Sequence, residues 1–289
     1  MKRSLLPLLL LPASVLAGQT PTPAPAASPY DRTVVLQAAG TDRVRVRRDV
    51  TYETVDGTAM KADVYLPPRG AGRAPYPAVI FVAGGAENTK EWGIYKSLGR
   101  LFAASGFAGV PFNHRLRYPR RQYEEGAADL LALVAHLRKN ASALEVDAGR
   151  IAIWAFSGGG PMLSVPIRER VPGVRCLVNY YAFMDTEHVD LAEAGVTREI
   201  AEKFSPLAQF NANSAALLPL FIARAGKDSI PGVNASIDKF AAAALEKNAS
   251  VLVVNHPDGE HGFEHRNADA RSREILRLTI EFLRAQLGR

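Results

Sequence analysis

The chain has 289 residues, of which 47% are hydrophobic and 22% charged, a composition that fits one α/β domain and excludes a coiled coil or a disordered chain. Its formal net charge of +6 includes Lys2 and Arg3, so about +4 remains once the N-terminal segment discussed next is removed. No run of Lys and Arg is dense enough to form a nucleic-acid groove. We therefore expect no nucleic-acid partner.

The N-terminus has the pattern of a signal peptide over residues 1–17. Two basic residues precede an apolar stretch over 5–16, and the small residue Ala17 follows as the last residue before cleavage. The stretch is too short to span a bilayer and is interrupted by two prolines. We expect a secreted or periplasmic protein with no stable membrane insertion after cleavage. A linker rich in Pro, Ala and Thr is predicted over 18–43, followed by the folded domain over 44–289.

Short β-rich runs alternate with longer stretches of helical spacing from about residue 44 onward. The runs over 46–53 and 59–66 flank the sequence TVDGT, so they are predicted to form an antiparallel pair. Six further strands are predicted over 76–85, 107–113, 150–156, 174–183, 218–226 and 250–256. Helices are predicted over 94–105, 123–138, 236–245 and 272–287, with another starting at Pro161. The alternation predicts an eight-stranded, mostly parallel sheet with helices on both faces.

The segment over 184–216 is longer than an ordinary connection between two strands of a sheet. Loops at the carboxyl ends of parallel strands build the ligand site in such folds, so a helical insertion here is predicted to form a short cap over that site. A plain packing appendage is the alternative.

Two other features have a structural interpretation. Arginines alternate with valines over 43–48, which is typical of a solvated edge strand. The single cysteine, Cys176, lies within an apolar run and is predicted to be a buried small hydrophobe rather than a reactive thiol.

The sequence WAFSGGG over 154–160 directly follows an apolar strand. A strand that runs into a glycine-flanked serine and then a helix is the context of a nucleophile elbow, in which a strained turn exposes the serine hydroxyl. Small residues are needed two positions before and after the serine, and Ala155 and Gly159 satisfy this requirement. The motif predicts Ser157 as a nucleophile; a flexible glycine turn is the alternative.

A serine nucleophile requires a base, normally a histidine that a carboxylate orients. His261 follows the last predicted strand, and Asp228 follows the strand before it. The order Ser157, Asp228, His261 is the chain order of α/β-hydrolase triads. Asp185 follows an earlier strand and is a competing acid.

Acyl transfer also needs backbone N–H donors for the developing oxyanion. Gly158, directly after the serine, is predicted to supply one, and Gly85 or Ala86, in the glycine-rich loop after the strand over 76–85, the other. The histidines lack metalloprotease spacing, so we expect no metal and no cofactor.

From about Thr51 to its C-terminus the chain resembles α/β-hydrolases of the dienelactone hydrolase and small carboxylesterase type. The resemblance is carried by the segments IFVAGGAEN, GFAGVPFNHRL, VDAGRIAIWAFSGGG, ARAGKDSIP and GEHGF. It implies the same triad and oxyanion donors, a structural ion pair between Arg115 and Asp129, and turn or strand-entry roles for Asp147 and Arg150. Two positions depart from the family pattern: Ala155 replaces the commoner glycine, and Ala83 stands where many relatives have histidine.

These observations predict a secreted serine hydrolase that cleaves a small or medium carboxylic ester through an acyl-enzyme. The alternatives are a peptidase or amidase on the same triad and a non-catalytic binding protein of this fold. Glu91, Trp92 and Tyr118 are candidate substrate-binding residues near the mouth of the site, or else plain surface residues. The sequence does not indicate an oligomeric state.

Overall fold

The computed structural model describes residues 28, 31–84, 89–118, 120–187, 189–214 and 217–288. The predicted signal peptide and residues 18–27 of the predicted linker lie outside this part of the chain. Within the described residues, eight strands form one sheet in the order β1-β2-β4-β3-β5-β6-β7-β8. The strands are β1 (Arg45–Val55), β2 (Thr58–Leu66), β3 (Tyr76–Val82), β4 (Ala108–Pro111), β5 (Val146–Phe156), β6 (Val174–Tyr180), β7 (Leu220–Ala225) and β8 (Val251–His256).

The sheet is mostly parallel, as predicted. Strand β2 pairs antiparallel with both β1 and β4, whereas the six strands from β4 to β8 pair in parallel. The central strands are buried on both faces, and all seven residues of β3 are buried, because helices cover both sides of the sheet. Because the six parallel strands run in the same direction, their carboxyl ends lie at one edge of the sheet, together with the loops that follow them.

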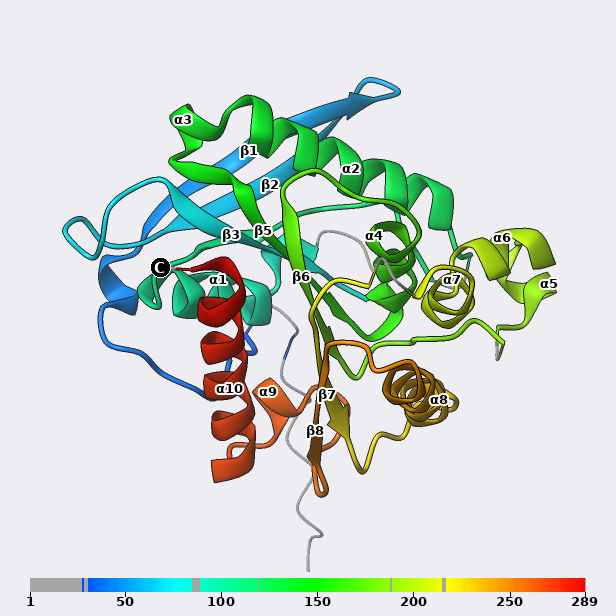
Figure 1. Ribbon diagram of the computed structural model, residues 1–289. Coiled ribbons are helices and arrows are strands. Elements are labelled where there is room, and N and C mark those ends of the chain that lie inside the picture. Colours follow the sequence, from blue (N-terminus) through cyan, green and yellow to red (C-terminus); the bar gives the residue numbers. More distant parts are fainter. Residues whose placement is uncertain are drawn as a thin grey trace, which may run out of the picture.

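Helices cover both faces of the sheet (Figure 1). Helices α1 (Gly93–Ala104) and α10 (Ala270–Leu287) lie on one face, and α2 (Tyr123–Lys139), α4 (Ser164–Arg168) and α8 (Val233–Glu246) lie on the other. The remaining helices are short: α3 (Ala141–Leu144), α5 (Leu191–Ala194), α6 (Arg198–Lys203), α7 (Pro206–Ala212), α9 (Phe263–Arg266), and the 3₁₀ helices η1 (Thr41–Arg43), η2 (Thr89–Glu91) and η3 (Ser157–Leu163).

The helix predicted to start at Pro161 begins earlier in the structure, and its first part is a 3₁₀ helix. The chain enters the 3₁₀ helix η3 directly at Ser157, and α-helical geometry starts only at Ser164. The glycines make this tight start possible, since Gly159 and Gly160 pack against the backbone of neighbouring segments.

The core is centred on an aromatic cluster around Trp154 of β5, a side chain with no exposed surface. Its ring makes edge contacts with Phe81, Phe102 and Tyr180, at centroid distances of 5.6, 5.0 and 4.6 Å. These rings come from strands on either side of β5 and from α1, so they fix the strand that precedes Ser157.

Cys176 of β6 is fully buried, as predicted. Burial raises the pKa of its thiol to about 12. The thiol therefore stays protonated at neutral pH and is not a nucleophile.

The ion pair implied by the resemblance is present, and the two predicted turn residues form a second one. The guanidinium of Arg115 donates to the buried carboxylate of Asp129 at 2.7 Å, and Arg150 Nε donates to Asp147 Oδ2 at 2.7 Å. At the sheet edge, Arg45 of β1 donates to Glu145 at 2.7 Å, so part of the predicted arginine-rich edge is paired rather than only solvated.

The predicted linker boundary at residue 43 is wrong. Val34 is 3% and Leu36 8% exposed, and both belong to the main hydrophobic core. Composition places these residues next to a proline-rich tract, but their apolar side chains are buried against the domain. The folded part of the chain therefore includes residues 31–43.

Three short helices, α5 to α7, form the segment between β6 and β7 in which the cap was predicted (Figure 1). Each of these helices begins with an N-cap side chain that accepts a hydrogen bond from a backbone N–H of its first turn. The N-cap residues are Asp190 for α5, Thr197 for α6 and Ser205 for α7. No helix within the described ranges is both long and apolar enough to cross a bilayer.

His114, which follows β4, is a buried titratable group with 5% exposure. Burial lowers the pKa of its imidazole to about 4, although the charge of Asp129 opposes this effect. The folded protein therefore keeps His114 neutral at a pH where an exposed histidine takes up a proton.

Lowering the pH from 7 to 5 is expected to reduce the free energy of unfolding by about 2 kcal/mol through His114. The unfolded chain binds the proton below its ordinary pKa of 6.5, whereas the folded protein binds it only near 4, so stability is lost as the pH falls through this window. Urea unfolding at both pH values measures the loss. Between pH 7 and pH 5, the free energy of unfolding of His114→Gln should fall by about 2 kcal/mol less than that of the wild type. An equal fall in both proteins would contradict the lowered pKa of His114.

Candidate active site

Ser157 occupies a strained turn at the carboxyl end of β5. Its φ angle is +52°, in the left-handed region that residues other than glycine rarely adopt. A β-carbon on Gly159 would lie 2.6 Å from the carbonyl oxygen of Val82, and one on Gly160 would lie 2.0 Å from that of Phe183. Glycine is therefore required at both positions, and the turn is a nucleophile elbow in its geometry.

The three residues of the predicted triad meet at the carboxyl edge of the sheet. Ser157 Oγ donates to His261 Nε2 at 2.8 Å, and His261 Nδ1 donates to Asp228 Oδ2 at 2.7 Å. Asp228 has no exposed side-chain surface, whereas the His261 side chain is 21% exposed. Asp228 Oδ1 also accepts from the backbone N–H of Ile230 at 2.9 Å, so both carboxylate oxygens are held. The arrangement can move a proton from the serine hydroxyl to a carboxylate-oriented imidazole.

Asp185, the competing acid, lies elsewhere. Its carboxylate accepts from Ser205 Oγ at 3.1 Å and from the backbone N–H of Glu187 at 3.2 Å. Both partners belong to the segment between β6 and β7. Asp185 therefore stabilises the start of that segment, and Asp228 is the acid that His261 contacts.

Gly84, just after β3, lies close to Ser157 and to the predicted oxyanion donor Gly158. A β-carbon on Gly84 would lie 3.1 Å from Ser157 Cβ and 3.2 Å from the nitrogen of Gly158. The chain after β3 thus passes directly alongside the serine and the predicted donor Gly158, and a side chain at Gly84 would press against both. Gly85 and Ala86, the candidates for the second donor, lie outside the described residues.

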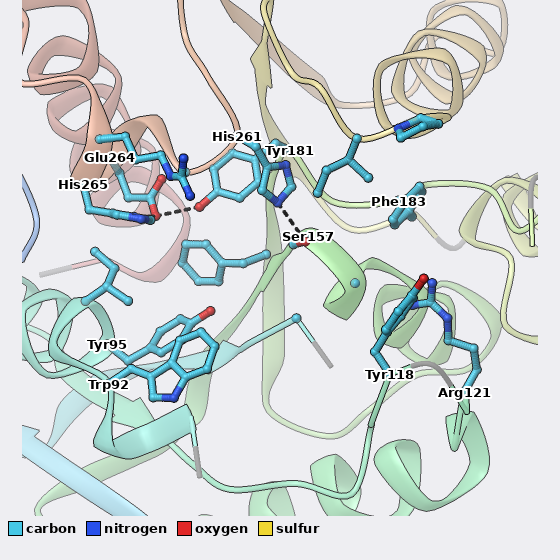
Figure 2. A pocket seen from close by; sticks show the side chains of 18 of the residues that line it. Trp92, Tyr95, Tyr118, Arg121, Ser157, Tyr181, Phe183, His261, Glu264 and His265 are labelled. Atoms are coloured by element: carbon cyan, nitrogen blue, oxygen red, sulfur yellow. Dashed lines mark hydrogen bonds and ion pairs between the residues drawn. The ribbon is translucent and has the colours of Figure 1, made fainter. Parts of the chain in front are cut away.

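A cavity of about 610 Å³ opens around Ser157 and His261 (Figure 2). Its walls include Trp92 and Tyr118, two of the three residues predicted to bind substrate. The segment between β6 and β7 contributes Val189 and residues around α5. A cavity of this size, mostly apolar with a few polar groups, is typical of a small-molecule site.

Glu91, the third residue predicted to bind substrate, is not among those that line the cavity. Its carboxylate pairs with Lys90 and, at 2.9 Å, with Lys96. Hydrogen bonds from Lys90 and then Lys96 lower the pKa of Glu91 to about 2. The buried ammonium of Lys90, which also pairs with Asp63 of β2 at 3.2 Å, thus draws Glu91 away from the cavity.

Sequence reasoning missed a cluster of polar groups beside His261. The Tyr181 ring lies 4.5 Å from the His261 ring, centroid to centroid, and its hydroxyl donates to Glu264 Oε1 at 2.6 Å. His265 Nδ1 is 3.0 Å from the same oxygen. Glu264 is 1% exposed and lies on α9, just after His261 in the chain. Figure 2 shows it beside His265 and Tyr181. Its proximity in sequence to His261 is the one signal that could have pointed to it.

Tyr181→Phe is expected to lower kcat about three- to tenfold, because the ring that packs against His261 loses its anchor on Glu264. It should also cost about 1–3 kcal/mol of stability, since a buried carboxylate loses a donor. Steady-state kinetics and thermal unfolding measure the two effects. Tyr52→Phe is the matched control, because its buried hydroxyl donates to the carbonyl of Asn113 at 2.7 Å, outside the cavity. A fall in kcat of the same size in the control would contradict the positioning role.

No group of three or more potential metal ligands occurs within the described part of the chain.

The comparisons with known proteins agree with this fold. Residues 62–166, which include Gly84 and Ser157, match the family model described as BD-FAE, an α/β-hydrolase-type family. No curated protein matches the sequence. Among solved structures, the chain is similar to native esterase 2 of the planctomycete Thermogutta terrifontis, with a TM-score of 0.66 and 19% identity over 85% of this chain and 93% of that one.

Two further structures of that esterase are similar to the same degree. The propionate-bound form has a TM-score of 0.66 and 19% identity over 86% of this chain and 96% of that one. The form phosphorylated by paraoxon has the same TM-score and identity over 86% and 97%. The chain therefore has the α/β-hydrolase fold, which confirms the predicted fold class. The resemblance found in the sequence is thereby confirmed as far as the α/β-hydrolase fold.

Proposed function

We propose that this protein is a serine hydrolase that cleaves carboxylic esters, with Ser157 as nucleophile, His261 as general base and Asp228 as the acid that orients it. The observation that carries the proposal is the continuous line of hydrogen bonds from Ser157 through His261 to Asp228, at 2.8 and 2.7 Å, with the serine at a positive φ. The similarity to an esterase of the same fold supports it.

In the proposed reaction Ser157 Oγ attacks the ester carbonyl carbon while its proton moves to His261 Nε2. The N–H of Gly158 donates to the oxyanion that forms, together with the second donor predicted at Gly85 or Ala86. The bond to the alcohol oxygen then breaks, and the alcohol leaves with the proton from His261. Water, deprotonated by His261, attacks the acyl-enzyme, and the acid departs as Ser157 regains its proton.

The proposal extends to location. The signal-peptide pattern over residues 1–17 supports export, so we infer a periplasmic or secreted enzyme. N-terminal sequencing of the protein recovered from cell fractions tests this inference, and a chain that begins at Met1 in the cytosolic fraction would overturn it.

Covalent labelling with paraoxon tests the nucleophile, and 4-nitrophenyl esters of increasing acyl length test the reaction. We expect one diethylphosphoryl group on the peptide that contains Ser157, together with loss of ester hydrolysis. Labelling of another residue would overturn the assignment of Ser157. Turnover of 4-nitroanilides but of no ester would favour an amidase or peptidase, and turnover of neither, with no labelling, a binding protein.

A further inference from the structure

Residues 31–36, which we call the N-terminal strap, form part of the wall of the cavity. The N–H of Val34 donates to Ser97 Oγ on α1 at 2.9 Å, and the N–H of Val35 donates to the carbonyl of Glu264 on α9 at 2.8 Å. With Val34 and Leu36 buried, the strap is tied to two separate helices beside the site. Its arginine, Arg32, lines the cavity.

Among the described residues, the guanidinium of Arg32 has one hydrogen-bond partner, a ring nitrogen of His265. Its Nη1 is 3.5 Å from His265 Nε2, a weak contact in which the arginine donates and the imidazole accepts. His265 therefore carries its proton on Nδ1, which donates to Glu264 Oε1 at 3.0 Å. Among the described residues, no carboxylate lies within 4.0 Å of a nitrogen of Arg32. A partly buried guanidinium that lines a cavity and has no carboxylate partner favours the binding of an anionic group of a ligand.

The two ends of the cavity differ in charge. Arg32 and Arg266 line the end at Glu264 and His265, where the one lining carboxylate among the described residues, that of Glu264, is buried and accepts from Tyr181 and His265. Arg266 pairs at 4.0 Å with Glu260, which does not line the cavity, so within the described part of the chain Arg32 is the cation of this end without a carboxylate partner. In Figure 2 this end lies on one side of Ser157, and Tyr118 and Arg121 lie on the other.

The opposite end has an excess of carboxylates. Asp190 and Glu193 line it, on the segment whose Ala194 carbonyl accepts from the N–H of Arg121. Among the described lining residues of this end, the one cation is Arg121, whose guanidinium lies 4.5 Å from the centroid of the Tyr118 ring. An anionic substrate group is therefore repelled at this end and attracted at the end of Arg32.

We propose that Arg32 forms an anion-binding subsite of the cavity, so that the preferred substrates are esters that carry a carboxylate on the portion lying toward the N-terminal strap. This inference rests on the proposed ester hydrolysis and adds the substrate class. The planar guanidinium binds a carboxylate through two parallel hydrogen bonds, and apolar lining side chains such as Trp92 and Phe183 contact the rest of the ester.

The anionic group can belong to the acyl or the alcohol portion, so the test uses two matched pairs of esters. The 4-nitrophenyl monoester of adipic acid, with its charge on the acyl portion, is compared with 4-nitrophenyl 6-methylheptanoate. The acetyl ester of 3-hydroxybenzoate, with its charge on the leaving portion, is compared with the acetyl ester of methyl 3-hydroxybenzoate. Each pair differs in one negative charge and little in shape.

The variants are Arg32→Gln, which removes the charge, and Arg32→Lys, which keeps the charge but not the planar pair of donors. We expect Arg32→Gln to lower kcat/KM about tenfold for the anionic member of one pair, mostly through KM, while the neutral member stays within about twofold. Arg32→Lys should retain part of the preference. The wild-type preference should weaken as ionic strength rises, because the contact is partly exposed.

Arg69→Gln removes one exposed positive charge outside the cavity and is the control for long-range attraction. A loss in this control as large as that in Arg32→Gln would overturn the subsite, as would equal losses of Arg32→Gln on the charged and neutral esters or no loss on either. In these cases the esters are still hydrolysed and the proposed function stands. If the wild type hydrolyses none of the four esters or of the 4-nitrophenyl panel, both the function and the subsite are overturned.

Discussion

Ser157→Ala is expected to lower kcat/KM for 4-nitrophenyl esters by at least about 10⁴-fold, with the fold intact. The variant lacks the hydroxyl that donates to His261 at 2.8 Å and that forms the acyl-enzyme in the proposed reaction. The residual activity comes from the remaining groups of the site. Initial rates measure the loss, and circular dichroism with thermal unfolding establishes that the variant is folded.

Ser105→Ala is the matched control. Ser105 follows α1, and its hydroxyl donates to the carbonyl of Leu101 at 2.8 Å, away from the cavity. This variant should keep its activity within about twofold, since a single exposed or half-buried hydroxyl bond contributes only about 1 kcal/mol to stability. Activity of Ser157→Ala within tenfold of the wild type would show that another residue is the nucleophile.

Asp228→Asn is expected to lower kcat about 10³- to 10⁴-fold while KM changes little. The carboxylate accepts from His261 Nδ1 at 2.7 Å and so holds the imidazole in the tautomer that accepts the serine proton. An amide can present its N–H instead, which favours the other tautomer. Steady-state kinetics with a short-chain 4-nitrophenyl ester measure the effect.

The matched control is Asp185→Asn, the other carboxylate that the sequence placed after a strand. Because Asp185 accepts from Ser205 and Glu187 rather than from His261, its variant should lose thermal stability and change kcat by no more than about threefold. If Asp185→Asn lost more activity than Asp228→Asn, the acid of the triad would have been assigned to the wrong residue.

The positions of Ser157, Asp228 and His261 could be predicted because each follows a strand that is easy to recognise. The run RIAIWAF is apolar after its first residue, as a strand buried on both faces must be. The run SVLVVNH is recognised by its four consecutive β-forming apolar residues, although it forms the edge strand β8 and is only partly buried. Parallel strands end at one edge of a sheet, so residues after them meet even when more than 30 positions separate them. Local sequence and this rule of topology were therefore sufficient to predict that the three residues lie close together.

The residues that were missed or misplaced depend on long-range packing. Glu91 looked available in the sequence, but Lys90, buried beside Asp63 of β2, holds its carboxylate. Arg32 looked like part of a linker, yet the apolar side chains that follow it are buried against the domain. Glu264 is a charged residue that composition predicts to be exposed, and it is buried because Tyr181 and His265 satisfy one of its oxygens.

The sequence by itself determined the order of strands and helices, the glycine-flanked turn at Ser157 and the chemistry that three strand ends can perform. These features follow from periodicity and from backbone sterics, which act over a few residues. Only the tertiary structure decided which charges face the cavity, that Glu264 is buried beside His261, and that the N-terminal strap closes one wall. Those outcomes depend on how polar groups distant in sequence compete for partners as the core excludes water, and no local pattern records that competition.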